Sequence, residues 1–184
     1  MSSNYFSEVE NSISVNDEVV QDDEESFGEE ELIQLVSFFL LNDIEYGIDI
    51  LTVHEILTMR DITRLPNVPS FIKGVINLRG NVIPVVDVRE RFNFPKGDIT
   101  DLTRIIVVET NGKLVGLIVD NVHQVVRLPL NNIDSPTGFF QGVSDEFLSG
   151  VGRLKDRLII ILNLNNILFP ESKLILDMDS VLES

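Results

Sequence analysis

The sequence has no cysteine and no tryptophan, and only two histidines and two tyrosines among its 184 residues. The lack of cysteine excludes a disulfide framework and thiolate chemistry. No apolar run approaches the roughly 20 residues that a membrane-spanning helix requires. The first residues, MSSNYFSEVENS, also lack the basic start and apolar centre of a signal peptide. These absences predict a cytoplasmic protein without direct membrane insertion.

Basic residues are missing from the first 31 positions, which carry 11 acidic side chains. The formal net charge of −16 comes mainly from this segment, because residues 32–170 have 15 acidic and 13 basic side chains. An acidic protein without a basic, aromatic-rich face is repelled by phosphate backbones, so we expect no nucleic-acid binding. The composition of residues 1–30 predicts a disordered acidic tail, which is either a solvated segment or an acidic docking segment.

Catalytic and metal-binding motifs are also missing. His54 and His123 each follow a valine, and their spacing matches no zinc-binding motif. We interpret them as packed or half-exposed side chains rather than as ligands or catalytic groups. Asp49, Asp87 and Asp120 each follow a predicted strand and precede apolar residues, which is typical of a helix cap. The sequence therefore predicts no enzyme activity, no cofactor and no bound metal.

An internal repeat is the most informative feature that the sequence does contain. The segment YGIDILTVHEIL, from Tyr46, matches VGLIVDNVHQVV, from Val115, at an offset of 69 residues. Further along, Gly74 and Gly150 begin two segments with the same apolar pattern, at an offset of 76 residues. Each half is predicted to contain a hairpin, a short connector, a strand, a tight turn, a strand and a brief helical segment, at 88–92 and at 164–168. Asn42-Asp43 is the predicted turn of the first hairpin, and Asn111-Gly112, a strong two-residue hairpin signal, is its counterpart in the second half.

Two repeats of about five short strands favour an all-β fold of two small five-stranded barrels, because so small a sheet protects its edges best by closing. Units of roughly 70 residues are marginal alone, so we expect a shared hydrophobic core and a groove between them. Residues 31–170 would form this domain, with order beginning near Leu32. The connector 128–147 is predicted to be a mobile loop. Residues 171–184 are a tail or a short helix that packs on a barrel or binds a partner.

Arg79 and Gly80 form the predicted turn between two strands of the first half. A rigid turn that presents a long planar donor favours an ion pair, with a partner protein or with a neighbouring carboxylate of this chain, for which Glu55 is the candidate. Both ion pairs are compatible with one another. Ile50 and Val53 lie on the connector that faces the inferred groove, and they fit equally well as core residues or as an apolar docking ledge.

The segments described above resemble the CheW family of chemotaxis coupling proteins. The resemblance covers about residues 31–169, and it depends on four stretches in the family's order: EYGIDILTVHEI, TRLPNVPSFIKGVINLRGNVIPVVDVRERF, TRIIVVETNGKLVGLIVDNV and FLSGVGRLKDRLIIILNLNNIL. It implies a CheW-like fold, in which two intertwined, five-stranded, SH3-like barrels and short helices surround a shared hydrophobic core.

By this resemblance the protein would be a non-catalytic adaptor that couples chemoreceptors to the histidine kinase CheA in membrane-associated signalling arrays. The cytoplasmic receptor tip would dock in the groove between the barrels, and the regulatory domain of the kinase would contact barrel ends. Contacts with itself or with a paralogue would also permit ring formation. The alternative is a CheW-like coupler of a receptor and kinase pathway other than chemotaxis.

The resemblance also implies which residues bind these partners. The predicted receptor-binding residues are Ile50, Val53, Glu55, Gly74 and Arg79. Arg104, which begins the hairpin of the second half, is the predicted kinase-binding residue. Two departures from the family pattern are the long acidic tail and His54, which stands where the family usually has another polar residue.

Overall fold

The computed structural model describes residues 30–41, 44–136 and 142–168. The predicted acidic tail, apart from its last residue, the predicted Asn42-Asp43 turn and the predicted C-terminal segment lie outside these ranges. The described residues form eleven strands, two short α-helices and three 3-10 helices, which confirms the all-β prediction. No helix in the described ranges is long and apolar enough to cross a membrane.

The elements follow the predicted plan closely. The first half contains β1 (Leu32–Leu40), β2 (Ile44–Asp49), η1 (Ile50–Thr52), β3 (Val53–Thr58), β4 (Ile72–Leu78), β5 (Asn81–Asp87) and α2 (Val88–Arg91). The second half contains β6 (Arg104–Thr110), β7 (Lys113–Val119), β8 (Asn121–Pro129), η2 (Leu130–Asn132), β9 (Ile133–Asp134), η3 (Asp145–Phe147), β10 (Leu148–Leu154), β11 (Arg157–Leu162) and α3 (Leu164–Leu168). The two helical segments predicted from the repeat are α2 and α3.

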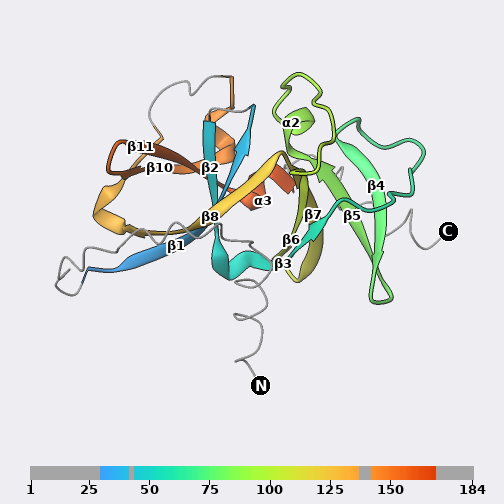
Figure 1. The fold of residues 1–184 in the computed structure, drawn as a ribbon, viewed down its shortest axis with the longest axis horizontal. Coiled ribbons are helices and arrows are strands. Elements are labelled where there is room, and N and C mark those ends of the chain that lie inside the picture. The colour runs from blue at the N-terminus through green and yellow to red at the C-terminus, as the bar shows by residue number, and fades with distance from the viewer. Residues whose placement is uncertain (1–29, 42–43, 137–141, 169–184) are drawn as a thin grey trace.

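The strands form two sheets, which are the two lobes in Figure 1. One sheet has the order β8-β1-β2-β11-β10-β9, and the other has the order β3-β6-β7-β5-β4. By the repeat, the strands β1, β2, β3, β4 and β5 correspond in turn to β6, β7, β8, β10 and β11. When each strand is replaced by its counterpart, β8-β1-β2-β11-β10 becomes β3-β6-β7-β5-β4. The repeat in the sequence is therefore a repeat in the structure, with β9 added to one sheet.

Each sheet takes one hairpin from the other half of the chain. Strand β2 pairs in parallel with β11, where Glu45 lies opposite Ile159, and β7 pairs in parallel with β5, where Gly116 lies opposite Val85. The remaining strand pairs are antiparallel. The two halves are thus intertwined, as the family resemblance implied, whereas the repeat alone predicted only two barrels.

The two histidines occupy equivalent irregularities in the two sheets. His54 is the extra residue where β3 shifts register against β6, and His123 is the extra residue where β8 shifts register against β1. A bulge of this kind redirects the strand locally. The shared bulge explains the matched spacing of the histidines, which lie in different sheets.

The predicted tight turns are confirmed at Arg79-Gly80 and Asn111-Gly112. Their φ angles are 51° and 88° in the first turn and 52° and 71° in the second. Two consecutive positive φ angles are typical of the two-residue turns that match the twist of a β-hairpin. Both hairpin tips are therefore short and rigid.

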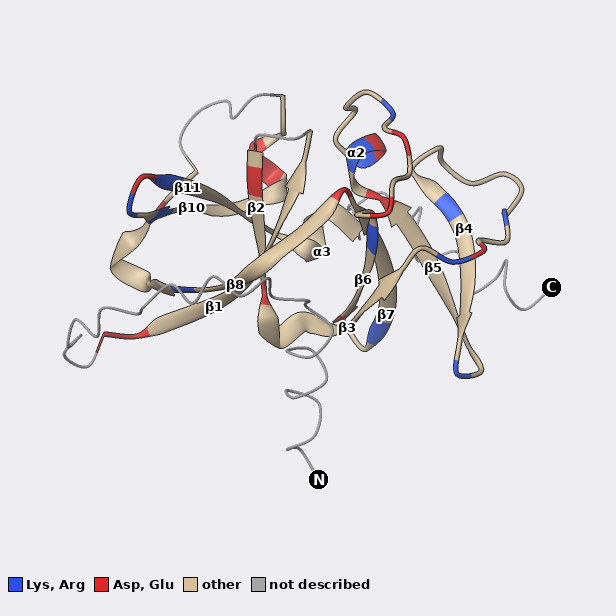
Figure 2. Ribbon diagram, in the orientation of Figure 1, with Lys and Arg blue, Asp and Glu red and all other residues tan. Residues whose placement is uncertain are grey.

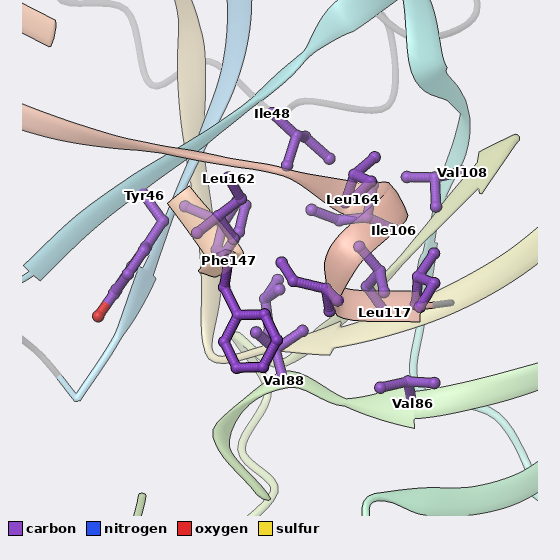
Figure 3. Close-up of a cluster of buried hydrophobic side chains, with 14 of the residues drawn as sticks. Tyr46, Ile48, Val86, Val88, Ile106, Val108, Leu117, Phe147, Leu162 and Leu164 are labelled. Atoms are coloured by element: carbon purple, nitrogen blue, oxygen red, sulfur yellow. The ribbon is translucent and has the colours of Figure 1, made fainter. Parts of the chain in front are cut away.

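The main hydrophobic core lies between the two sheets and is shared by both halves, as predicted. Figure 3 shows part of it, with side chains from β2, β5, β6, β7, β11 and both helices in one cluster. Ten of its members are Tyr46, Ile48, Val86, Val88, Ile106, Val108, Leu117, Phe147, Leu162 and Leu164. Each sheet also encloses a smaller apolar cluster of its own. Because one core includes strands from both halves, neither half can bury its apolar surface alone.

The connector 128–147 is more regular than predicted. Strand β8 continues to Pro129, η2 follows, and β9 pairs with β10, where Ile133 lies opposite Gly152. The backbone N–H of Leu130 also donates to the carbonyl of Glu31 at 3.0 Å. Residues 137–141 lie outside the described ranges. For most of the described part of the connector, the prediction of a loop is wrong. Its backbone N–H and C=O groups form hydrogen bonds in β8, η2, β9 and η3, which the composition does not indicate.

Candidate functional site

An open hollow of about 310 Å³ lies where the two sheets meet. Its lining consists of Asp49, Thr52, Thr110, Ser149, Leu162, Asn163, Leu164 and Asn165. The volume is at the lower end of the range for ligand pockets, so it suits one or two side chains rather than a cofactor. The hollow lies where the repeat predicted a groove, but its lining is largely polar.

The connector at the edge of the hollow is the 3-10 helix η1. Asp49 caps it, because its Oδ1 accepts a hydrogen bond from the N–H of Leu51 at 2.9 Å, and the hydroxyl of Thr52 donates to the Asp49 carbonyl at 2.6 Å. This tight turn sends successive side chains in different directions. Ile50 enters the shared core with 9% of its surface exposed, whereas Leu51 is 77% exposed. Of the two roles open for Ile50, the structure gives it the core role.

Leu51 is therefore an outward-facing residue that the sequence reasoning missed. A large exposed aliphatic side chain beside a concave surface is a common feature of protein-binding sites. Val53, the next candidate along the chain, is partly buried and packs against the shared core. Leu51 and Val53 flank Thr52, which lines the hollow, and Leu51 supplies most of the exposed apolar surface of the two.

Glu55 and Arg79 form the ion pair that the sequence predicted. The Nη1 of Arg79 lies 3.0 Å from Oε1 of Glu55, and Nη2 donates to Oε2 at 3.4 Å. Glu55 belongs to β3 and Arg79 to the β4–β5 turn, so the pair connects the two edge strands of the five-stranded sheet. The Arg79 side chain is 69% exposed, and Figure 2 shows a basic residue at the tip of this hairpin. The guanidinium therefore keeps donors available to a partner.

The turn that presents Arg79 is held by its own side chains. The Oδ1 of Asn77 accepts a hydrogen bond from the N–H of Gly80 at 3.0 Å, across the turn. Arg79 itself has a positive φ of 51°. A residue without a β-branch tolerates this conformation at a cost, so the hydrogen bond from Gly80 helps to fix the direction of the arginine.

Gly74 is buried and contacts other parts of this chain. Its φ is +140°, and a Cβ atom placed on it would overlap the carbonyl of Thr63 and lie 2.9 Å from Cγ2 of Ile62. Thr63 and Val75 exchange two backbone hydrogen bonds of 2.9 Å each at this crossing. Gly74 therefore allows the segment around Thr63 to pass across β4, and its influence on a partner acts through that segment.

Arg104 lies at the far end of β3 from the hollow, because it pairs with Thr58 in the sheet. Its Nη1 donates to the carbonyl of Asp101 at 2.6 Å and to that of Thr103 at 2.9 Å. These bonds tie Arg104 to its own loop. The structure thus separates Arg104 from the predicted receptor-binding residues.

A second face of the molecule, which we call the closed face, is equivalent by the repeat to the face with the hollow. Arg89 in α2 occupies the position of Asn165, and Asp120 occupies the position of Leu51. The Nε of Arg89 donates to Oδ2 of Asp120 at 2.9 Å, and a second guanidinium nitrogen contacts the same oxygen. The N–H of Leu41 donates to it at 2.9 Å. The closed face is therefore filled by an ion pair.

Asp120 corrects one of the sequence predictions. It was expected to cap a helix, as Asp49 and Asp87 do, but the residues that follow it form β8. Its carboxylate binds Arg89 instead. Asp87 caps α2 as predicted, because its Oδ1 accepts from the N–H of Glu90 at 3.2 Å. Burial raises the pKa of the Asp87 carboxyl above its ordinary value of 3.8.

The face with the hollow, which we call the open face, has short polar side chains at the equivalent positions. Asn165 accepts hydrogen bonds from Thr110 and Asn111 at the tip of the β6–β7 hairpin. Asn163 caps α3, because its Oδ1 accepts from the N–H of Asn166 at 3.2 Å. Asn165 is too short to fill the space that Arg89 fills on the closed face. The open face is therefore a site for hydrogen bonding and apolar contact.

No group of three or more histidine, cysteine, aspartate or glutamate residues in the described parts of the chain is placed to hold a metal ion. The open face combines the exposed Leu51, a polar hollow, and an exposed arginine, Arg79, that is paired with Glu55 of β3. Such a mixture of apolar and polar groups is suited to protein recognition.

Comparison with known proteins assigns the fold to a family. The profile of the CheW-like domain matches residues 35–169. The chemotaxis protein CheW of Klebsiella aerogenes is 37% identical over 153 residues, which are 83% of this chain and 89% of that protein. The chemotaxis protein CheW of Bacillus subtilis is 38% identical over 134 residues, which are 73% of this chain and 86% of that protein.

A solved structure agrees with these sequence matches. The scaffolding protein TtCheW from Thermoanaerobacter tengcongensis has a crystal structure that aligns with a TM-score of 0.73 and 38% sequence identity. The alignment covers 78% of this chain and 97% of TtCheW. Because the profile covers most of the chain and the fold agrees, the chain belongs to the CheW family.

Proposed function

We propose that this protein is a non-catalytic coupling adaptor that links chemoreceptors to the histidine kinase CheA in signalling arrays. Membership of the CheW family supports the proposal, together with the names of its relatives as chemotaxis proteins and of TtCheW as a scaffolding protein. The observation that carries it is the contrast between the two equivalent faces. The closed face is filled by the chain's own ion pair, and the open face presents unfilled polar and apolar groups.

The receptor tip, a helical hairpin in the family, docks along β3 on the open face in this proposal. Leu51 and Val53 give it an apolar contact where the strand begins, and Arg79, paired with Glu55 two residues after Val53, gives it charged hydrogen-bond donors. Glu55 holds the arginine in place. Gly74 acts indirectly, by allowing the segment at Thr63 to cross β4.

The regulatory domain of the kinase binds at the other end of the five-stranded sheet in this proposal, near Arg104. The loop before Arg104 carries two exposed aliphatic residues, Ile99 at 67% and Leu102 at 56%. Arg104 fixes the end of this loop through its bonds to Asp101 and Thr103. The kinase contact would therefore combine the two aliphatic side chains with a loop that Arg104 holds rigid.

An adaptor with two separate binding surfaces works by geometry. When it binds receptor and kinase together, the second contact becomes intramolecular, and weak contacts combine into a stable assembly. The protein would then be cytoplasmic and recruited to receptor arrays at the membrane. Two equivalent sheet ends also allow end-to-end contacts with a related domain, which can close into a ring.

Co-sedimentation with receptor-containing membranes tests the receptor contact. We expect Arg79→Ala and Leu51→Glu each to weaken receptor binding by about tenfold or more, which corresponds to about 1.4 kcal/mol. Lys155→Ala is the matched control, because Lys155 is exposed and occupies the equivalent turn with a φ of 52°. Circular dichroism checks that each variant is folded. Undiminished binding by both Arg79→Ala and Leu51→Glu would exclude this contact.

Addition of CheA to the same membranes tests the coupling itself. We expect wild-type protein to bring the kinase into the pellet, and Arg104→Ala with Leu102→Glu to lose the kinase while still binding receptor. If wild-type protein binds receptor but recruits only the kinase of another signalling pathway, the alternative coupler is correct. If it recruits no kinase, the coupling function is wrong.

A further inference from the structure

We propose that the polar hollow of the open face binds a side-chain amide, from an asparagine or glutamine, presented by the partner that docks there. This inference rests on the proposed function, and it specifies the chemistry that the site recognises. Its basis is a count of the hydrogen-bonding atoms in the hollow, which separates the atoms already used by the fold from those left for a ligand.

Most of the oxygen atoms in the hollow are already engaged within the chain. Oδ1 of Asn163 caps α3, and Oδ1 of Asn165 accepts from Thr110 and Asn111. Oδ1 of Asp49 caps η1. Each of these oxygens maintains local structure. A ligand therefore meets the other polar atom of each side chain.

The remaining atoms form a mixed set of donors and acceptors. The amide nitrogens of Asn163 and Asn165 are donors, and Oδ2 of Asp49 is an acceptor. None of the three has a hydrogen-bond partner among the residues that the structure describes. The hollow thus offers two amide NH2 groups and one carboxylate oxygen to whatever enters it, beside the hydroxyl of Ser149, which can either donate or accept.

A neutral amide is the side-chain group that matches this set. A carboxylate would accept from the two asparagines, but the charge of Asp49 would repel it. A lysine or arginine would suit Asp49, but it has no acceptor for the two amide nitrogens. The carbonyl of a primary amide accepts from the asparagines while its NH2 group donates to Asp49. The size of the hollow, about 310 Å³, also accommodates one such side chain.

The repeat shows that the amide of Asn163 is not required by the fold. Asp87 occupies the equivalent position in the first half and caps α2 through the same bond, at the same distance of 3.2 Å. Both residues also donate their backbone N–H to a phenylalanine carbonyl at 2.8 Å, from Phe71 and Phe147 respectively. An aspartate at 163 would therefore cap α3 equally well. The nitrogen that distinguishes asparagine is left for recognition.

Two isosteric substitutions and their combination test the amide. Asn163→Asp and Asp49→Asn each keep the capping oxygen, so both variants should fold. We expect each single variant to weaken binding to receptor-containing membranes by about tenfold, because each leaves an unmatched donor or acceptor. We expect the double variant to recover to within about threefold of wild type, because an amide ligand can rotate by 180° and exchange its two ends.

The matched control is Asn132→Asp, which adds the same charge on η2 away from the hollow and should bind normally. Stronger binding by Asn163→Asp would identify a cationic ligand, and stronger binding by Asp49→Asn an anionic one. Either result overturns the inference. If the single variants bind normally while Leu51→Glu does not, the hollow is not used, although the proposed function survives. If wild-type protein fails to bind receptor membranes, the proposed function fails and the inference with it.

Discussion

The closed face and the open face are built on the same arrangement of strands, and the side chains at two of their equivalent positions account for the difference in filling. Arg89 and Asp120 fill the closed face, where Leu41 and Gly97 also contact them. Asn165 and Leu51 stand at these positions on the open face and leave a hollow. The backbone plan therefore does not decide where a partner binds. In a fold made of two repeats, a site arises where one repeat lacks the side chain that fills the other.

The same kind of difference separates the two equivalent glycines. Gly74 has a positive φ and lies against the backbone of Thr63, whereas Gly150 lies against the side chain of Ile133 and the carbonyl of Asp134. Both accompany a register shift in their hairpin. The first glycine is therefore required by backbone conformation and by space, and the second mainly by space.

Replacement of these glycines gives the largest expected effect. Gly74→Ala should destabilise the protein by about 3 kcal/mol or more, because the new methyl group overlaps the Thr63 carbonyl and the positive φ is strained. Gly150→Ala should cost about 1–2 kcal/mol, since Cγ2 of Ile133, at 2.7 Å, has to shift. Urea unfolding measures both. Equal costs would mean that the two bulges are equivalent after all.

Removal of the filling residue gives the next effect. Arg89→Leu should cost about 2 kcal/mol, because it leaves the half-buried Asp120 carboxylate without its cation. Asn165→Ala should cost about 1 kcal/mol or less, because its hydrogen bonds to Thr110 and Asn111 are exposed. Thermal unfolding compares the two variants. A larger loss for Asn165→Ala would show that the open face depends on that residue for stability, contrary to the comparison.

The smallest effect concerns the two helix caps. Because burial raises the pKa of Asp87, the folded state binds its proton more tightly than the unfolded state does. The stabilisation from the protonated carboxyl is complete when the pH is below 3.8, the ordinary pKa of this group. It is lost as the pH rises through the raised pKa of the folded state. Asp87→Asn keeps the capping oxygen, as Asn163 does, and avoids this loss.

The Asp87→Asn variant should therefore gain stability relative to wild type as the pH increases above the raised pKa, by less than Asn165→Ala loses. Urea unfolding at acidic and neutral pH measures the difference. Asn163→Asp is the reverse change on α3 and serves as the comparison. A wild-type advantage at neutral pH would show that the charge of Asp87 stabilises α2.

Local features of the fold could be predicted from the sequence, because they depend on neighbouring residues. Asn111-Gly112 predicted a two-residue turn from its conformational freedom, and the Arg79 turn with Glu55 was predicted from the rigidity of the turn. The exchange of hairpins was not derivable from the repeat. The apolar pattern of β2 suits either β5 or β11, and the choice between them depends on packing between distant segments.

The errors at the candidate site have similar causes. The sequence could not distinguish a core role from a docking role for Ile50. Buried and exposed residues of a strand are distinguished by their alternation, and a 3-10 turn interrupts that alternation. Leu51 was missed for the same reason. Asp120 resembled a helix cap locally, and its partner Arg89 lies 31 residues away. A carboxylate at the end of a strand has the same local sequence pattern whether it caps a helix or forms an ion pair. Its role therefore depends on which residue lies beside it in the fold.

The parallel pairing of β2 with β11 also means that the first sheet is completed late during synthesis of the chain. Glu45 lies opposite Ile159, which the ribosome adds 114 residues later (159 − 45). At about 5–20 residues per second, that interval lasts about 6–23 s. During this time the first hairpin has neither its parallel neighbour nor the core that covers Val36 and Phe38. Among the described residues, β11 is the last strand, and it completes the sheet that the chain begins first. A nascent chain that ends before β11 therefore lacks the parallel neighbour of β2 and part of the shared core.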